Sequence, residues 1–248
     1  METRCIVINK FWCKVGVGIE APESYKMTNG MYIYKWFKAK GWADKPICAI
    51  IGNMEAESGL NPGQEETTQW TSQVSGHGLV QWTPGILLRN YTDSIHKNWY
   101  NWQAQLSFMY AEYQASMRPG WQDGLDQWIS TRYYPYTYNH FVHDKKSSLA
   151  YLTEAFVRCY ERPNMQSAHV PRRVKSAKRF FNYLKHHAPG DIDIGDDNTD
   201  YEGDDTIGGN EADDRDDPYN IFMSGHDRLK KFNYILYGGK KHGYNNNN

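Results

Sequence analysis

The sequence predicts a mainly α-helical fold, followed by an acidic segment outside that fold. Apolar side chains recur every three or four residues in several stretches, which is the spacing of one helix face. Helix start and stop signals bound these stretches, for example Pro46 in a first turn and Gly59 after a last turn. Residues 190–217, by contrast, hold 13 acidic side chains against one basic side chain. That composition predicts a disordered linker.

The first 27 residues predict a short strand and a loop. Residues 5–12 are rich in β-branched and aromatic side chains, and residues 21–26 contain Pro22. We assign residues 1–27 to an N-terminal extension ahead of the helical domain.

Two consecutive helices are predicted next. Thr28 is an expected N-cap and Gly41 a stop signal, which predicts a helix over residues 28–40. Asp44 is the expected N-cap of a second helix, from about residue 45 to residue 58. The two helices are expected to pack on each other.

One acidic side chain shares a face of the second helix with apolar residues. At about 100° per residue, Ile47, Ile50, Met54 and Glu57 fall on one stripe, and Glu55 falls roughly opposite. Burial and the negative end of the helix dipole both disfavour a charged carboxylate there, which predicts a raised pKa for Glu57. A carboxyl group that keeps its proton can act as a general acid. The alternative is a helix-end carboxylate that bends into water.

The rest of the helical domain predicts a polar loop and four more helices. Residues 63–78 have no hydrophobic period and are expected to form an active-site loop or a short hairpin. Helical spacing then recurs at residues 98–115, 123–129, 149–160 and from 171 onward. Aromatic side chains of the first of these are expected in the core, whereas Arg173 and Arg179 of the last are expected to face solvent. The tyrosine-rich segment 133–138 predicts an irregular rim.

Charge and composition exclude several classes of protein. Residues 1–189 carry 22 basic against 15 acidic side chains, a surplus that attracts anionic polymers such as bacterial cell wall. No basic run or reader motif indicates nucleic acid. The four cysteines form neither a disulfide framework nor a CxxC zinc pair, and His140 with Asp144 lacks an H-x-H partner, so no metal and no cofactor are predicted. We find no secretory signal and no apolar run long enough to span a membrane.

Two short motifs resemble those of enzymes that cut bacterial cell wall. Residues 51–62 contain Glu57-Ser58 followed by Asn61-Pro62, and residues 78–83 contain Gly78-Leu79-Val80-Gln81. Both are similar to motifs of goose-type lysozymes and soluble lytic transglycosylases. Together with Tyr160-Glu161-Arg162-Pro163, they resemble the phage tail lysozyme family over about residues 28–187. The resemblance implies a lysozyme-like helical domain with a small β-hairpin or loop lobe.

This resemblance implies a set of site residues. Glu57 would be the general acid, and Glu66, nine positions later, the second carboxylate; a solvated loop charge is the alternative for Glu66. Ser58 would steady the Glu57 carboxylate, Gln81 would line the cleft and Tyr160 would approach Glu57. Ser58 and Gln81 could instead be satisfied polar groups, and Tyr160 a core aromatic at a helix end.

The predicted function is a virion-associated lysozyme, made in the host cytoplasm and carried in a phage tail. It would cleave the β-1,4 bond between N-acetylmuramic acid and N-acetylglucosamine in peptidoglycan and open the host wall during entry. A separation of about 7–9 Å between Glu57 and Glu66 favours inversion and about 5 Å favours retention. Without a second carboxylate the enzyme would be a lytic transglycosylase that yields anhydro products. A structural tail or internal virion protein with little or no activity is the alternative.

The sequence therefore divides into four parts. An N-terminal extension (1–27) precedes the catalytic domain (28–189), the acidic linker (190–217) and a C-terminal segment (218–248). The last segment regains apolar residues but is too short for a core of its own. We expect it to dock on other virion tail subunits.

Overall fold

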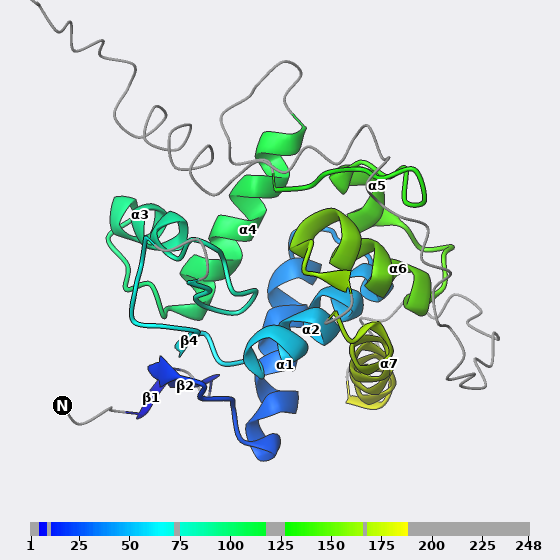
Figure 1. Cartoon of the computed structure of the whole chain (residues 1–248). Coiled ribbons are helices and arrows are strands. Elements are labelled where there is room, and N and C mark those ends of the chain that lie inside the picture. The colour runs from blue at the N-terminus through cyan, green and yellow to red at the C-terminus, as the bar shows by residue number, and fades with distance from the viewer. Residues whose placement is uncertain (1–4, 9–10, 72–74, 118–126, 166–167, 188–248) are drawn as a thin grey trace, which may run out of the picture.

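The computed structural model describes residues 5–8, 11–71, 75–117, 127–165 and 168–187. This part of the chain is mainly helical, as predicted (Figure 1). Its helices are α1 (Glu23–Lys38), α2 (Asp44–Ser58), α3 (Ile86–Ser94), α4 (Trp102–Ser116), α5 (Tyr138–His143), α6 (Leu149–Phe156), the π-helical turn η1 (Val157–Glu161) and α7 (Val170–His187). Its strands are β1 (Cys5–Ile8), β2 (Phe11–Lys14), β3 (Gly16–Val17) and β4 (Gln64–Glu65). The predicted linker and C-terminal segment lie outside the described residues.

Helix α2 is the central element, in contact with α1, α5, α6 and α7 (Figure 1). All of its residues are buried except Ala56 and Glu57. Gly52 permits the close approach of α7, because a Cβ atom at this position would lie 2.7 Å from the backbone nitrogen of Ala177. Helix α2 ends as predicted, at Gly59 in the left-handed conformation (φ 57°). The expectation of a single apolar face is wrong, because neighbours cover α2 on all sides.

Helix α1 starts five residues earlier than predicted, so the expected loop at residues 21–26 is mostly helix. Pro22 precedes its first residue with φ −56°, which suits a helix start, and Glu23 complements the positive end of the helix dipole. Thr28 therefore lies inside the helix rather than at its cap. Asp44 is likewise the first residue of α2 and not its cap; its carboxylate accepts hydrogen bonds from Tyr34 and Lys38 instead.

The N-terminal strands pack on the helical core. β1 and β2 pair antiparallel, and the Phe11 ring of β2 stacks on Trp102 with 4.7 Å between ring centroids. The side chain of Asn29 in α1 binds the backbone N–H and carbonyl of Trp12. β3 pairs in parallel with β4, which belongs to the polar segment predicted as a loop or hairpin. His77 continues this small lobe through isolated bridges to Glu65 and Trp82.

The later helices agree with the periodicity in part. Aromatic residues of α4 are in the core as predicted, with Trp102 and Tyr113 both 6% exposed. Helices α3 and α5 were not predicted, and residues 127–129 of the expected helix at 123–129 are not helical; residues 123–126 lie outside the described residues. The expected tyrosine rim is wrong, because Tyr133 is exposed but Tyr134, Tyr136 and Tyr138 are buried. Among the described helices, none combines the length and the hydropathy needed to cross a membrane.

Candidate active site

Glu57 lies in the last turn of α2, where the helix reaches the edge of the core. Its side chain is 19% exposed, and its Oε1 atom accepts a hydrogen bond of 2.5 Å from Nη2 of Arg173. The carboxylate is therefore sheltered on most sides, and its charge is matched by a guanidinium. The sequence pattern predicted the partial burial of Glu57 but not its ion pair with Arg173.

Arg173 is the residue that organises this end of α2. It is 5% exposed, so the expectation that it faces solvent is wrong. Its Nε donates to the Ala168 carbonyl at 2.6 Å, and its Nη1 donates to Oδ1 of Asn53 at 3.0 Å. The first turn of α7 packs directly against Gly52, since a Cβ there would lie 2.7 Å from the Arg173 carbonyl oxygen. This close packing turns the guanidinium inward, towards Asn53 and Glu57.

A second acidic group, Glu161, lies within the electrostatic influence of Glu57 and Arg173. It ends the π-helical turn η1, and its Oε1 atom is buried without a hydrogen-bond partner among the described residues. Burial raises the pKa of Glu161 well above its usual value; the negative charge of Glu57 raises it further, while Arg173 and Arg162 oppose the shift. The sequence did not lead us to expect Glu161 near Glu57. The available signal was its place beside Tyr160 in the third motif.

Tyr160 binds a different glutamate from the one expected. It is 1% exposed, and its hydroxyl donates to Oε2 of Glu112 in α4 at 2.5 Å. The indole N–H of Trp82 donates to the same carboxylate at 3.3 Å. Burial, followed by the charge of Glu112, raises the pKa of Tyr160. Tyr160 is thus a buried aromatic near a helix end whose hydroxyl binds Glu112, and its approach to Glu57 stays a prediction.

Ser58 and Gln81 hold the loop that carries the second motif. The Ser58 hydroxyl is directed to the carbonyl oxygens of Met54 and Leu79, each at 2.9 Å, and so links the two motifs directly. Gln81 adopts φ 48° and donates from Nε2 to the Gly78 carbonyl at 2.8 Å. The bonds of both side chains position the loop beside the end of α2, and their roles towards Glu57 and the sugar stay predictions.

Glu66 lies in the small lobe, just after β4. Its side chain is exposed, and Oε2 accepts a 2.9 Å hydrogen bond from the backbone N–H of Gly76. Its neighbour Glu65 is more sheltered, with Oε1 3.9 Å from Nε2 of the buried His77. Burial raises the pKa of Glu65 and lowers that of His77. Glu57 and Glu66 thus sit on separate elements, each with a partner of its own.

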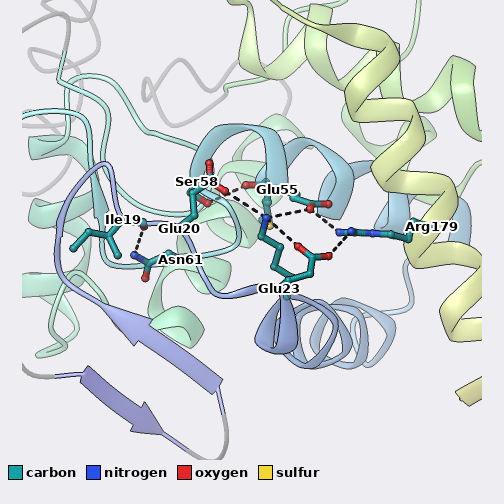
Figure 2. Close-up of polar contacts among 9 residues, drawn as sticks. Ile19, Glu20, Glu23, Glu55, Ser58, Asn61 and Arg179 are labelled. Atoms are coloured by element: carbon teal, nitrogen blue, oxygen red, sulfur yellow. Dashed lines mark hydrogen bonds and ion pairs between the residues drawn. The ribbon is translucent and has the colours of Figure 1, made fainter.

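Glu55 belongs to a different charged cluster, about 200° around α2 from Glu57. Figure 2 shows its carboxylate facing Arg179 of α7, at 2.6 Å, with Glu23 of α1 on the same guanidinium. Lys26 adds an ion pair of 3.6 Å to Glu55. The Arg179 side chain is 39% exposed, in agreement with the expected solvent-facing side, although its guanidinium binds two carboxylates. This cluster fastens α1, α2 and α7 together and takes no part in the site around Glu57.

The described residues contain no group of three or more His, Cys, Asp or Glu side chains arranged to hold a metal ion. The ionisable groups that meet at the end of α2 are the carboxyl group of Glu57 and the guanidinium of Arg173. A partly sheltered carboxyl group at the edge of the core is a candidate for proton transfer.

Comparison with known proteins identifies the family of the chain. The family model described as phage tail lysozyme matches residues 28–184, a range that contains all three motifs. Morphogenesis protein 1 of Bacillus phage B103 is 31% identical over 157 residues, which cover 63% of this chain and 39% of that protein. The chain thus spans well under half of this relative. The match of the family model over most of the chain shows that the protein belongs to the phage tail lysozyme family.

Proposed function

We propose that this protein is a virion-associated lysozyme that cleaves the β-1,4 bond between N-acetylmuramic acid and N-acetylglucosamine. The observation that carries the proposal is the position of Glu57, partly sheltered in the last turn of α2 and fastened to the second motif through the Ser58 to Leu79 hydrogen bond. Family membership supports a peptidoglycan substrate. The enzyme would be carried in a phage tail and would open the host wall locally during entry.

In this proposal Glu57 is the general acid. It gives its proton to the glycosidic oxygen while the bond from the anomeric carbon to that oxygen breaks and the electron pair stays on the leaving oxygen. Water then adds to the anomeric carbon, with Glu66 as the proposed base, and its proton returns to a carboxylate. In the transglycosylase variant an internal hydroxyl replaces the water and gives an anhydro sugar. Gln81 would line the sugar-binding side.

The test is a muropeptide analysis after incubation of the full chain with purified peptidoglycan from Gram-positive and Gram-negative bacteria. New reducing ends indicate a lysozyme, anhydro ends a transglycosylase, and new amino groups a peptidase. Glu57→Gln should lower the rate by about 100-fold or more while the thermal unfolding curve stays within a few degrees of the parent. A Glu57→Gln protein with full activity would refute the assignment.

Glu66→Gln separates the two ways of completing the reaction. If Glu66 activates water, this variant should lose hydrolysis to a similar extent as Glu57→Gln. If it keeps the parent rate and the products carry anhydro ends, Glu57 works without a second carboxylate from the small lobe.

A structural role is the second candidate function, and the name of the B103 relative, Morphogenesis protein 1, favours it. In that case the chain would assemble into a virion, with residues 218–248 as the proposed docking segment for tail subunits, and would release no product from any wall preparation. This candidate would be supported over the lysozyme if the chain is incorporated into particles and the muropeptide analysis detects no product.

A further inference from the structure

One buried side chain of α4 binds both ends of the small lobe. The lobe, taken here as residues 63–71 and 75–78, follows Pro62 and is followed by Leu79. Oε1 of Gln105 accepts a hydrogen bond of 2.9 Å from the backbone N–H of Leu79, and its Nε2 donates to the Pro62 carbonyl at 2.7 Å. Gln105 is 0% exposed, and both bonds are buried. A single amide group therefore joins the entry and the exit of the lobe to α4.

The Gln105 amide is fully engaged by backbone groups. Besides Pro62, its Nε2 donates to the carbonyl of Trp99, just ahead of α4, at 2.8 Å. A glutamine amide has one oxygen acceptor and two N–H donors, and here they meet one backbone N–H and two backbone carbonyls. The opposite orientation of the amide would place its oxygen against two carbonyl oxygens, so the partners also fix which way the amide points. Gln105 therefore acts on the chain segments that it holds.

The chain of the second motif lies directly on this amide. Gly78 has a φ of 82°, and a Cβ atom there would lie 2.8 Å from Oε1 and 2.9 Å from Nε2 of Gln105. Glycine adopts this conformation readily and leaves room for the amide. The N–H of Gly78 donates to the carbonyl of Gln64 in β4 at 2.9 Å. The position of β4, which Glu66 follows, is thus coupled to the Gln105 amide.

Leu79 is also bound to the end of α2. Its carbonyl accepts a 2.9 Å hydrogen bond from the hydroxyl of Ser58, the residue after Glu57. Leu79 is therefore held on one side by the helix with the proposed general acid and on the other by α4. Glu66, the proposed base, belongs to the lobe. The separation of the two carboxyl groups consequently depends on where the lobe lies, and Gln105 holds the lobe at both ends.

We propose that Gln105 is a positioning residue of the active site, which fixes the small lobe, with Glu66, relative to Glu57. It acts through the backbone of Pro62 and Leu79 and not through a contact with sugar. The inference rests on the lysozyme function proposed above. It assigns to one buried amide the arrangement of lobe and helix on which that reaction depends.

Amide hydrogen exchange of the full chain tests the inference without any need for activity. Gln105→Met keeps the length of the side chain and removes its hydrogen bonds, so the amides of Leu79 and Gly78 should exchange about 10-fold faster or more relative to the amides of α2. Thr153→Val is the matched control, because it removes a buried hydrogen bond to the Leu149 carbonyl in α6. It should leave this ratio at the parental value. An unchanged ratio in Gln105→Met overturns the inference.

Steady-state kinetics of wall cleavage give a readout that a purely structural role would not move. In Gln105→Met, kcat should fall by about 10-fold or more, because a displacement of about 1 Å between lobe and helix misplaces the reacting groups. KM should change less, since Gln105 itself binds no sugar. Thr153→Val should keep kcat within about twofold of the parent at a temperature where both variants are folded. An equal loss of kcat in the two variants would overturn the positioning role.

The parent protein decides the question should Gln105→Met fail to fold. Its Leu79 amide should exchange as slowly as the amides of α4, and exchange as fast as that of exposed loop amides overturns the inference. Failure of the proposed function has a different signature. A parent that cleaves no wall refutes the lysozyme proposal alone, whereas an unchanged exchange ratio in Gln105→Met refutes the positioning role alone.

Discussion

Nη2 of Arg173 lies 2.5 Å from Oε1 of Glu57, across 116 positions of sequence. This contact joins the first turn of α7 to the last turn of α2, which lies within the first motif. The same guanidinium binds Asn53 one turn earlier in α2 and the Ala168 carbonyl ahead of α7. The geometry of the proposed general acid therefore depends on a helix at the far end of the domain.

Arg173→Lys should destabilise the protein by about 3 kcal/mol, because a lysine ammonium cannot replace the fork that serves Ala168, Asn53 and Glu57. Urea denaturation gives the free energy of unfolding. Arg172→Lys, at an exposed neighbouring position, is the matched control and should change that free energy by less than about 0.5 kcal/mol. Equal effects of the two changes would contradict the role assigned to Arg173.

Tyr160→Phe should cost about 1–3 kcal/mol of stability, because Oε2 of the buried Glu112 loses its closest donor. The indole of Trp82 remains as a donor to the same carboxylate. The loss of stability should therefore be smaller than for a buried carboxylate that keeps no donor. Tyr183→Phe on α7, where the ring is only partly buried, serves as the control with a small effect. The prediction fails if both variants unfold at the same urea concentration.

Gly52→Ala should destabilise the protein by about 1–3 kcal/mol through overpacking between α2 and α7. The added methyl group would meet the backbone nitrogen of Ala177 and the carbonyl oxygen of Arg173, each at 2.7 Å. Because both atoms are backbone, the additional change Ala177→Gly should not restore stability. Thermal unfolding measures the effect, and Ala56→Ser in the same helix should cost only about 0.5 kcal/mol. Full rescue by Ala177→Gly would place the strain on the side chain instead.

Stability should fall as the pH drops below about 6.5, with His77 as one cause. Burial lowers the pKa of His77 in the folded protein, so the unfolded chain binds the proton more readily, and the contribution of His77 is present above its unfolded pKa and lost as acid is added. His77→Phe keeps a ring on Trp70, whose centroid lies 3.9 Å away, but removes this titration. Denaturation curves at pH 5 and pH 7 should therefore differ less in His77→Phe than in the parent. His186→Gln, an exposed change, should keep the parental difference.

The sequence predicted those parts of the site that depend on neighbours along the chain. The end of α2 at Gly59 follows from a residue that adopts the left-handed conformation easily. The helical class and the two motifs flanking the small lobe are likewise local properties. Glu57 was identified from its position in such a motif.

Helix boundaries and hydrogen-bond partners were predicted less well, because residues outside the local pattern decide both. Thr28 and Asp44 are both good N-cap types, yet Pro22 starts α1 earlier and the Asp44 carboxylate is used by Tyr34 and Lys38. Tyr160 was expected beside Glu57, but a tyrosine at a helix end has several possible acceptors. Which acceptor it binds depends on where α4 places Glu112.

The chain alone thus determines a mainly helical phage tail lysozyme domain with Glu57 at the end of a helix, because helix signals and motifs act over a few residues. Only the tertiary structure decided that Arg173 turns inward and that Tyr160 binds Glu112. The first follows from the packing of α7 on Gly52, and the second from the position in which α4 places Glu112. Side-chain periodicity predicts that one face of a helix packs against another element. The identity of that element decides which charged groups lie near each ionisable side chain.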